Sequence, residues 1–276
     1  MKPANKIIIY DDSCPLCEAY TAAFIKAGFL QKDGRQSFAH ADESLLARID
    51  LFRSKDEIPL LDLHTGKVLY GIDALLDVLS QKFSFIKPMA MVRPINWVIR
   101  KLYKLISYNR RVIVAPKKNA SGFDCTPFFN IRYRLAFIII GLIFNTMILF
   151  PLYTYILRPL PLNDITITQL QMAHLLLVVT NMITALLLKK EKSLEFLGQI
   201  NMVALITMLL LIPLLIINKY LSANLQLNLL YCFGLAIIMG KAYFRRMRYA
   251  GINISNSSVI ATNLIAFAVF LLYIIW

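Results

Sequence analysis

Long apolar stretches with almost no charged residues fill the second half of the chain. They begin after Arg134 and continue to Trp276. Each is close to the length of about 20 residues that a helix needs to cross the hydrocarbon core of a bilayer. The expected spans are residues 135–157, 167–188, 197–217, 225–243 and 259–276. The sequence therefore predicts an all-α polytopic membrane domain of about five transmembrane helices over residues 134–276, and it excludes a single water-soluble globule.

The composition supports this interpretation. Hydrophobic residues make up 58% of the 276-residue chain and charged residues 17%, whereas soluble domains contain about 45–50% apolar and about 25% charged residues. The net charge is +14. Because this excess of Lys and Arg accompanies membrane spans, we attribute it to orientation and to contact with anionic lipid head groups, and we expect no nucleic-acid partner.

The basic residues also predict the orientation of the spans. Lys and Arg number 11 in residues 87–134, then 1, 3, 1 and 4 in the four loops that follow. Since basic loops stay on the cytoplasmic side, we expect a multi-pass protein of the bacterial cytoplasmic (inner) membrane. Its N-terminal domain would face the cytoplasm and its C-terminus the opposite side. A strand-like segment at residues 6–10, with no signal peptide before it, fits this orientation.

The first half has the short apolar runs and frequent charges of a soluble domain. The predicted strands are residues 6–10, 36–40, 59–63 and 67–70, and the predicted helices are residues 14–30, 42–54 and 73–81. The resulting order, β-α-β-α-β-β-α, is that of a minimal thioredoxin fold. Residues 1–86 are therefore expected to form an α/β thioredoxin-like N-terminal domain.

A basic amphipathic helix and a connector are expected between the two domains, over residues 87–133. The helix, residues 93–107, carries an apolar stripe that includes Ile95, Val98 and Leu102, with Lys101 and Lys104 elsewhere. Two interpretations stay open. The helix would either lie on the cytoplasmic leaflet as an anchor or pack its apolar face on the soluble domain.

The motif Cys14-Pro15-Leu16-Cys17 carries the chemistry of the soluble half. It follows the first strand and opens a helix, so Cys14 is expected at the N-cap with Pro15 in the first turn. There the unpaired backbone N–H groups favour a thiolate. Cys14 would attack a client disulfide, and Cys17, one turn further, would resolve the mixed disulfide. The direction of exchange depends on a reduction potential that the sequence does not contain.

Three further residues are candidates for this site. We hypothesise that Asp11 transfers a proton to or from Cys17. The alternative is that Asp11 and Asp12 only make turn hydrogen bonds at the strand–helix junction. Ile58 and Pro59 open the third strand, and a cis proline there would leave the backbone before it free to pair with an extended client.

A metal site is the main structural alternative for the cysteine pair, since Cys-x-x-Cys is also a common zinc spacing. A second pair is needed, and the other two cysteines, Cys125 and Cys232, are isolated. Neither Cys125 nor the histidines His40 and His64 has a spacing that completes a tetrahedral site. We therefore predict no metal and no cofactor other than the redox-active cysteine pair.

Three motifs in order resemble the DCC (domain of unknown function 393) family of thiol-disulfide oxidoreductases. They are Asp11-Asp12-Ser13-Cys14-Pro15-Leu16-Cys17, then Gly71-Ile72-Asp73-Ala74, and then Tyr103 to Arg110 with its closing Asn109-Arg110. The resemblance implies a thioredoxin-like fold, Cys14 and Cys17 as the redox pair, and Asp11 as the family's aspartate. The chain departs from the pattern at Asp12, where the family has Gly, and residues 135–276 lie outside the resemblance.

The membrane half offers one further candidate, His174, a single imidazole inside the second span that would reach a quinone or a proton path. An interhelical hydrogen bond is the alternative. With Cys125 in the connector as a third thiol, this suggests a quinone-linked redox relay. A non-catalytic scaffold or docking subunit is the remaining alternative.

The interpretation that the residues favour is a membrane-anchored thiol-disulfide oxidoreductase. It would exchange disulfides with a protein client through its cytoplasmic Cys14–Cys17 motif. A membrane protein is one candidate for this client.

Overall fold

The computed structural model describes residues 6–115, 125–158, 165–221, 224–252 and 257–275. The chain divides into two compact units, Met1–Arg134 and Leu135–Trp276. We describe each unit by itself.

The first unit is built on a four-stranded mixed sheet with the strand order β2-β1-β3-β4. The strands are β1 (Lys6–Tyr10), β2 (Arg35–Ser37), β3 (Pro59–Asp62) and β4 (Val68–Tyr70). β1 pairs with β2 in parallel, and the other two pairings are antiparallel. This arrangement confirms the thioredoxin-like fold that the order of the elements predicted.

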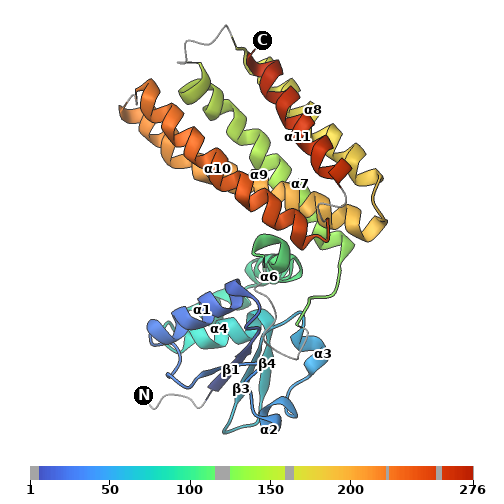
Figure 1. The fold of residues 1–276 in the computed structure, drawn as a ribbon. Coiled ribbons are helices and arrows are strands. Elements are labelled where there is room, and N and C mark those ends of the chain that lie inside the picture. The colour runs from blue at the N-terminus through green and yellow to red at the C-terminus, as the bar shows by residue number, and fades with distance from the viewer. Residues whose placement is uncertain (1–5, 116–124, 159–164, 222–223, 253–256, 276) are drawn as a thin grey trace. The chain divides into compact units, whose positions relative to one another are not determined.

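Helices cover both faces of the sheet (Figure 1). On one face lie α1 (Pro15–Lys26) and α4 (Gly71–Ser80), whose apolar side chains pack on Ile8 and Leu60. The short helices α2 (Glu43–Leu46) and α3 (Leu51–Ser54) follow β2, and the residues around α2 pack with Ile9 and Leu61 on the other face. Because successive side chains of a strand point to opposite faces, Ile8 and Ile9 belong to different cores.

Two predicted helices differ from the observed ones for identifiable reasons. The predicted helix 14–30 ends at Lys26, because Gly28 adopts a left-handed conformation with φ of 72°. The predicted helix 42–54 splits in two, because Asp50 is not helical and its side chain accepts the backbone N–H of Arg53 at 3.0 Å as a new N-cap. The predicted strand 36–40 is also shorter and ends at Ser37.

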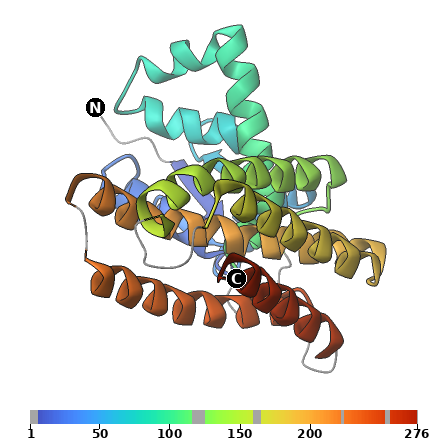
Figure 2. The ribbon, with the colours of Figure 1, turned by 90° about the horizontal axis from the view of Figure 1, so that it is seen from above.

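Two helices follow α4 along one side of the first unit, α5 (Ile86–Met91) and α6 (Arg93–Ile113) (Figure 2). The sequence did not predict α5, and it ended the next helix at residue 107. Both helices lie within the first compact unit, although the sequence analysis set residues 87–133 apart from the first domain.

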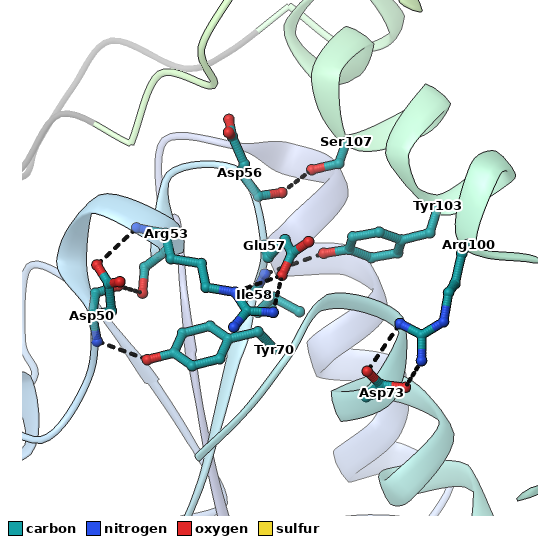
Figure 3. A network of polar contacts seen from close by, with 11 residues as sticks. Asp50, Arg53, Asp56, Glu57, Ile58, Tyr70, Asp73, Arg100, Tyr103 and Ser107 are labelled. Carbon is teal, nitrogen blue, oxygen red and sulfur yellow. Dashed lines mark hydrogen bonds and ion pairs between the residues drawn. The ribbon is translucent and has the colours of Figure 1, made fainter.

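Polar contacts hold the inner face of α6 to the sheet domain (Figure 3). The Arg100 guanidinium binds both carboxylate oxygens of Asp73 on α4, at 2.6 and 3.0 Å. The Tyr103 hydroxyl accepts the backbone N–H of Ile58 at 3.1 Å, and the Ser107 hydroxyl donates to the backbone carbonyl of Asp56. The helix thus packs on the soluble domain through Arg100, Tyr103 and Ser107, whereas Ile95, Val98 and Leu102 of the apolar stripe are exposed.

The second unit is helical. Within the described residues, four helical segments are long and apolar enough to cross a membrane. They are Ile131–Leu157, which comprises α7 (Ile131–Leu152) and the π-helical η1 (Tyr153–Leu157), then α8 (Ile167–Leu186), α9 (Lys190–Leu221) and α10 (Leu225–Tyr249). A further helix, α11 (Ser257–Ile275), contains a shorter apolar segment. The expected polytopic helical domain of about five spans fits this arrangement.

Several of these helices extend beyond the predicted spans. The largest difference is at α9, which begins at Lys190 instead of residue 197, and α10 continues past residue 243 to Tyr249. Hydropathy identifies only the part that suits hydrocarbon, while the backbone hydrogen bonds of a helix continue through charged residues such as Lys192 and Arg246.

Polar side chains inside the second unit join its helices. Asn218 on α9 and Asn228 on α10 exchange amide hydrogen bonds at 2.8 and 3.1 Å. The Asn201 amide donates to the backbone carbonyl of Phe137 on α7 at 3.4 Å, and the Arg246 guanidinium donates to Gln199 at 2.8 Å. Because lipid offers no competing partners, such bonds fix the pairing of neighbouring helices.

Candidate active site

Cys14 occupies the N-cap of α1, as the sequence predicted. Its backbone is extended (φ −96°, ψ 105°), and Pro15 begins the helix. The Cys14 sulfur accepts the backbone N–H of Cys17 at 3.4 Å. The cap therefore directs a helix N–H group at the sulfur, which favours its charged form. Both cysteines are free thiols and both are buried.

The two thiols differ in acidity. The pKa of Cys14 is lowered from 9.0 to about 7, first by a hydrogen bond from the Cys17 side chain and further by the Cys17 backbone N–H and the Arg110 charge, while burial opposes the shift. The same side-chain hydrogen bond and burial raise the pKa of Cys17 well above its ordinary value. Near neutral pH the pair thus consists of one ionisable nucleophile and one protonated partner.

Asp11 directly follows β1, three residues before Cys14. Its Oδ1 accepts the backbone N–H of Ser13 at 3.0 Å and the Ser13 hydroxyl at 2.6 Å. These are the turn hydrogen bonds that the sequence analysis gave as the alternative to proton transfer. The other oxygen, Oδ2, is buried and has no hydrogen-bond partner among the described residues, although a guanidinium lies within ion-pair distance of it.

Arg110, which the sequence analysis did not assign to the site, brings a buried positive charge to it. It lies near the end of α6, is 6% exposed, and its Nη2 is 3.6 Å from Asp11 Oδ2. Its charge lowers the pKa of both Cys14 and Cys17. The spacing of residues could have indicated this position of Arg110. Tyr103, Ser107 and Arg110 follow one another at intervals of four and three residues, so they share the inner face of the helix.

A cavity of about 50 Å³ lies beside the resolving cysteine. Its lining includes Cys17, Asp11, Ser107 and Arg110. Two polar atoms of this lining, Asp11 Oδ2 and Arg110 Nε, have no hydrogen-bond partner among the described residues. The volume is large enough for about three water molecules. The arrangement can therefore carry protons between the carboxylate and the buried sulfur through water.

Cys125 is buried in the same unit. Its side chain packs with Ile9, Phe38 and Leu61 on the sheet face opposite α1 and α4, and its backbone carbonyl accepts a hydrogen bond from Arg110. Burial raises the pKa of the Cys125 thiol, which makes it a poor nucleophile at neutral pH. The structure thus brings Cys125 to the neighbourhood of Asp11 and Arg110, in an apolar setting.

Ile58 and Pro59 do not offer the free backbone that the sequence analysis considered. No peptide bond among the described residues is cis, so the Ile58–Pro59 bond is trans. The Ile58 N–H donates to the Tyr103 hydroxyl, and its carbonyl accepts the N–H of Gly71 at 2.9 Å. Because both groups already have partners inside the unit, a client strand cannot pair with them in this state.

The remaining candidates lie elsewhere. His174 is partly buried on α8 in the second unit, and no hydrogen bond or ion pair of its ring occurs within the described ranges. Cys232 is also in that unit, on α10. In the first unit, His40 contacts the Ser37 hydroxyl through Nδ1 at 2.9 Å. No group of three or more His, Cys, Asp or Glu able to hold a metal ion is found in the part of the chain that the structure describes.

The sheet order and the cysteine pair at the start of α1 define the first unit as a thioredoxin-like domain equipped for thiol chemistry. Residues 8–115 match the model of the family described as DCC1-like thiol-disulfide oxidoreductase. This match covers most of the N-terminal unit and confirms the resemblance of its motifs. Arg110 lies within the matched region, whereas Cys125 and the apolar helices lie outside it. No curated protein and no solved structure matches the chain.

Proposed function

We propose that the protein is a membrane-anchored oxidoreductase whose N-terminal unit exchanges disulfides with a protein client. The observation that carries this proposal is the unequal acidity of the two thiols at the start of α1. One sulfur, with a pKa of about 7, is ionised in part at neutral pH, and the other is held protonated one turn away. Thiol–disulfide exchange needs this combination of an attacking thiolate and a resolving thiol.

The reaction proceeds in two displacements. The Cys14 thiolate attacks one sulfur of the client disulfide, forms a mixed disulfide and releases the other client sulfur as a thiolate, which takes up a proton. Cys17 then loses its proton and attacks the Cys14 sulfur, which forms the Cys14–Cys17 disulfide and releases the second client thiol. The client gains two electrons and the protein loses two. An external dithiol of lower potential restores the reduced pair, and an oxidising partner runs the sequence in reverse.

Asp11 is the proposed proton acceptor for Cys17 in the second step. Asp11 and Cys17 line the same cavity. The Oδ2 atom of Asp11 accepts no hydrogen bond among the described residues, and the Arg110 guanidinium lies 3.6 Å from it. A base near the resolving thiol is needed because the pKa of Cys17 is raised well above its ordinary value.

Client access requires an opening step. Cys14 is 1% exposed, and the Ile58 backbone makes hydrogen bonds with Tyr103 and Gly71. The proposed reaction therefore begins with a local rearrangement that uncovers Cys14. This step, and not the ionisation of the sulfur alone, sets the rate with a bulky client.

The proposed location is the bacterial inner membrane, with the N-terminal unit in the cytoplasm. The alternation of basic residues between the apolar helices supports this orientation, and a reducing compartment favours transfer of electrons to the client.

The decisive experiment is trapping with a Cys17→Ser variant of the full chain, in which Cys125 and Cys232 are also replaced by Ser. In native membranes this variant should retain a client through Cys14 as a complex that dithiothreitol releases. The matched control, which also carries Cys14→Ser, should retain none. Purified full-length protein should also reduce a disulfide-bonded protein faster than free dithiothreitol does. The absence of both effects would favour a docking subunit, and activity that requires an added quinone would favour the relay.

A further inference from the structure

One face of helix α6 makes polar contacts with the sheet domain, and a separate apolar stripe of the same helix is exposed. The inner face carries Tyr103, Ser107 and Arg110, which contact the domain as described above. A second stripe runs along the other side, where Ile95, Val98 and Leu102 are 37%, 43% and 51% exposed. Their spacing of three and four residues places them on one line of the helix. We call these three residues the outer face; Trp97 lies on the neighbouring line of the helix, with Lys101 and Lys104 at intervals of four and three residues.

Neighbouring residues extend this exposed apolar surface. Trp97 is 65% exposed, and on the adjacent helix α5 the side chains of Met89 and Met91 are 51% and 54% exposed. Soluble surfaces carry isolated apolar side chains, but a group of large ones on two contacting helices indicates an interaction surface.

The charged residues of α5 and α6 are all basic. Residues 82–113 contain eight Lys and Arg and no Asp or Glu. Four of the basic side chains on α5 and α6, Lys87, Arg93, Lys101 and Lys104, are exposed. A helix that combines Trp and aliphatic residues with flanking Lys and Arg has the composition of one that lies in the interface of an anionic membrane.

The same stripe of α6 leads to the start of the first apolar helix. Asn109, seven residues after Leu102 and on the same line of the helix, donates its side-chain N–H to the backbone carbonyl of Tyr133 at 3.0 Å. The Tyr108 and Tyr133 rings stack with centroids 5.1 Å apart. Tyr133 belongs to Ile131–Leu157, the first segment able to cross a membrane. The C-terminal end of the stripe therefore lies next to the residues that open the first apolar helix.

From these observations we infer that the outer face of α6, with Met89 and Met91 of α5, docks on the anionic surface of the bilayer. The apolar side chains enter the boundary between head groups and acyl chains, and Lys101 and Lys104 contact lipid phosphates. This inference goes beyond the proposed thiol exchange and does not depend on it.

Trp97 provides a direct probe, because the chain contains only two tryptophans. A Trp276→Phe variant of the full chain, reconstituted in nanodiscs of phosphatidylcholine and phosphatidylglycerol, leaves Trp97 as the single emitter. With brominated acyl chains its emission should fall about twofold, since interfacial helices insert roughly 5–10 Å into this boundary. Aqueous iodide should quench it weakly.

Two variants separate the parts of the inference. Val98→Asp with Leu102→Asp, both at exposed sites, should abolish quenching by the brominated lipid, and Lys101→Glu with Lys104→Glu should weaken it in anionic discs. The matched control reverses two exposed lysines of another region, Lys26→Glu with Lys32→Glu, and should change nothing. Trp97 emission open to iodide and untouched by bromine would overturn the inference. Emission protected from both quenchers would also overturn it, because protein and not lipid would then cover the outer face.

Discussion

Arg110 places a guanidinium beside a carboxylate and two thiols, all of them buried. Removing such a charge from water costs several kcal/mol unless a partner compensates it, and here Asp11 is that partner. The pairing cancels the repulsion that Asp11 alone would exert on a thiolate, so the site can hold a negative sulfur close to an acidic residue.

Replacing Arg110 by Met should raise the pKa of Cys14 by about one unit or more, because the substitution removes a favourable charge and leaves Asp11 unopposed. The pH dependence of Cys14 alkylation by iodoacetamide measures this shift, with circular dichroism as a check of folding. Arg93→Met on the exposed start of α6 is the matched control. An unchanged alkylation profile in Arg110→Met would contradict a role of this charge in activating the sulfur.

The hydrogen bond between the two thiols leads to a second prediction, about the pH at which Cys14 becomes reactive. In the wild type, alkylation of Cys14 should increase with pH through about 7. In Cys17→Ala the midpoint should move upward by about one unit, since a hydrogen bond to a charged group contributes about 1.5–3 kcal/mol. A Cys125→Ala variant should keep the wild-type midpoint. If Cys17→Ala also keeps it, the helix end and not Cys17 lowers the pKa.

At the scale of secondary structure, the sequence predicted the elements better than their ends. Alternating and helical patterns located every strand and the two long helices of the sheet domain. Gly28 and Asp50 carried readable signals for a helix end and a helix start, but the apolar pattern ran across them and outweighed both. The contacts of Arg110 and Tyr103 could not be predicted in the same way, because they depend on how α6 packs, which involves residues more than 40 positions apart.

A comparison of Gly71 with Gly28, which both have a left-handed backbone, tests why Gly stands at position 71 of the motif. At Gly71 (φ 62°) an added Cβ would lie 3.0 Å from Tyr103 Cε1 and 3.3 Å from the Glu57 side chain, whereas at Gly28 (φ 72°) it would meet nothing within 4 Å. Gly28→Ala should therefore cost only the backbone strain of about 1–2 kcal/mol.

Gly71→Ala should cost about 1–3 kcal/mol more than Gly28→Ala, because it also displaces the Tyr103 ring from its place against Ile58. Thermal unfolding of the full chain in detergent, followed by the fluorescence of Trp97 in the Trp276→Phe background, compares the two variants. Equal losses of stability would mean that the contact with Tyr103 does not constrain this position.

At the scale of the whole molecule, hydropathy alone divided the chain close to where the two units separate, at Arg134. This part was predictable because a bilayer imposes a length and a composition on each helix, independently of how the helices pack. The packing of the helices was not predictable, since it depends on individual pairs such as Asn218 with Asn228.

The orientation of the spans can be tested by inserting a protease site in each loop. A site after Lys189 should be cut only from the cytoplasmic side, because the loop that contains it is rich in Lys. A site after Asn163 should be cut only from the opposite side, because its loop is not. Inverted membrane vesicles and intact spheroplasts provide the two sides. Cleavage of both sites from one side would contradict the proposed arrangement of spans.

The burial of Cys14, which is 1% exposed, has a consequence for its oxidation. A thiolate at neutral pH is the form that hydrogen peroxide converts to sulfenic acid and then irreversibly to sulfinic acid. While the site is closed, peroxide must approach this atom through an almost fully buried surface. We therefore expect the closed site to be oxidised more slowly than an open thiolate of the same acidity.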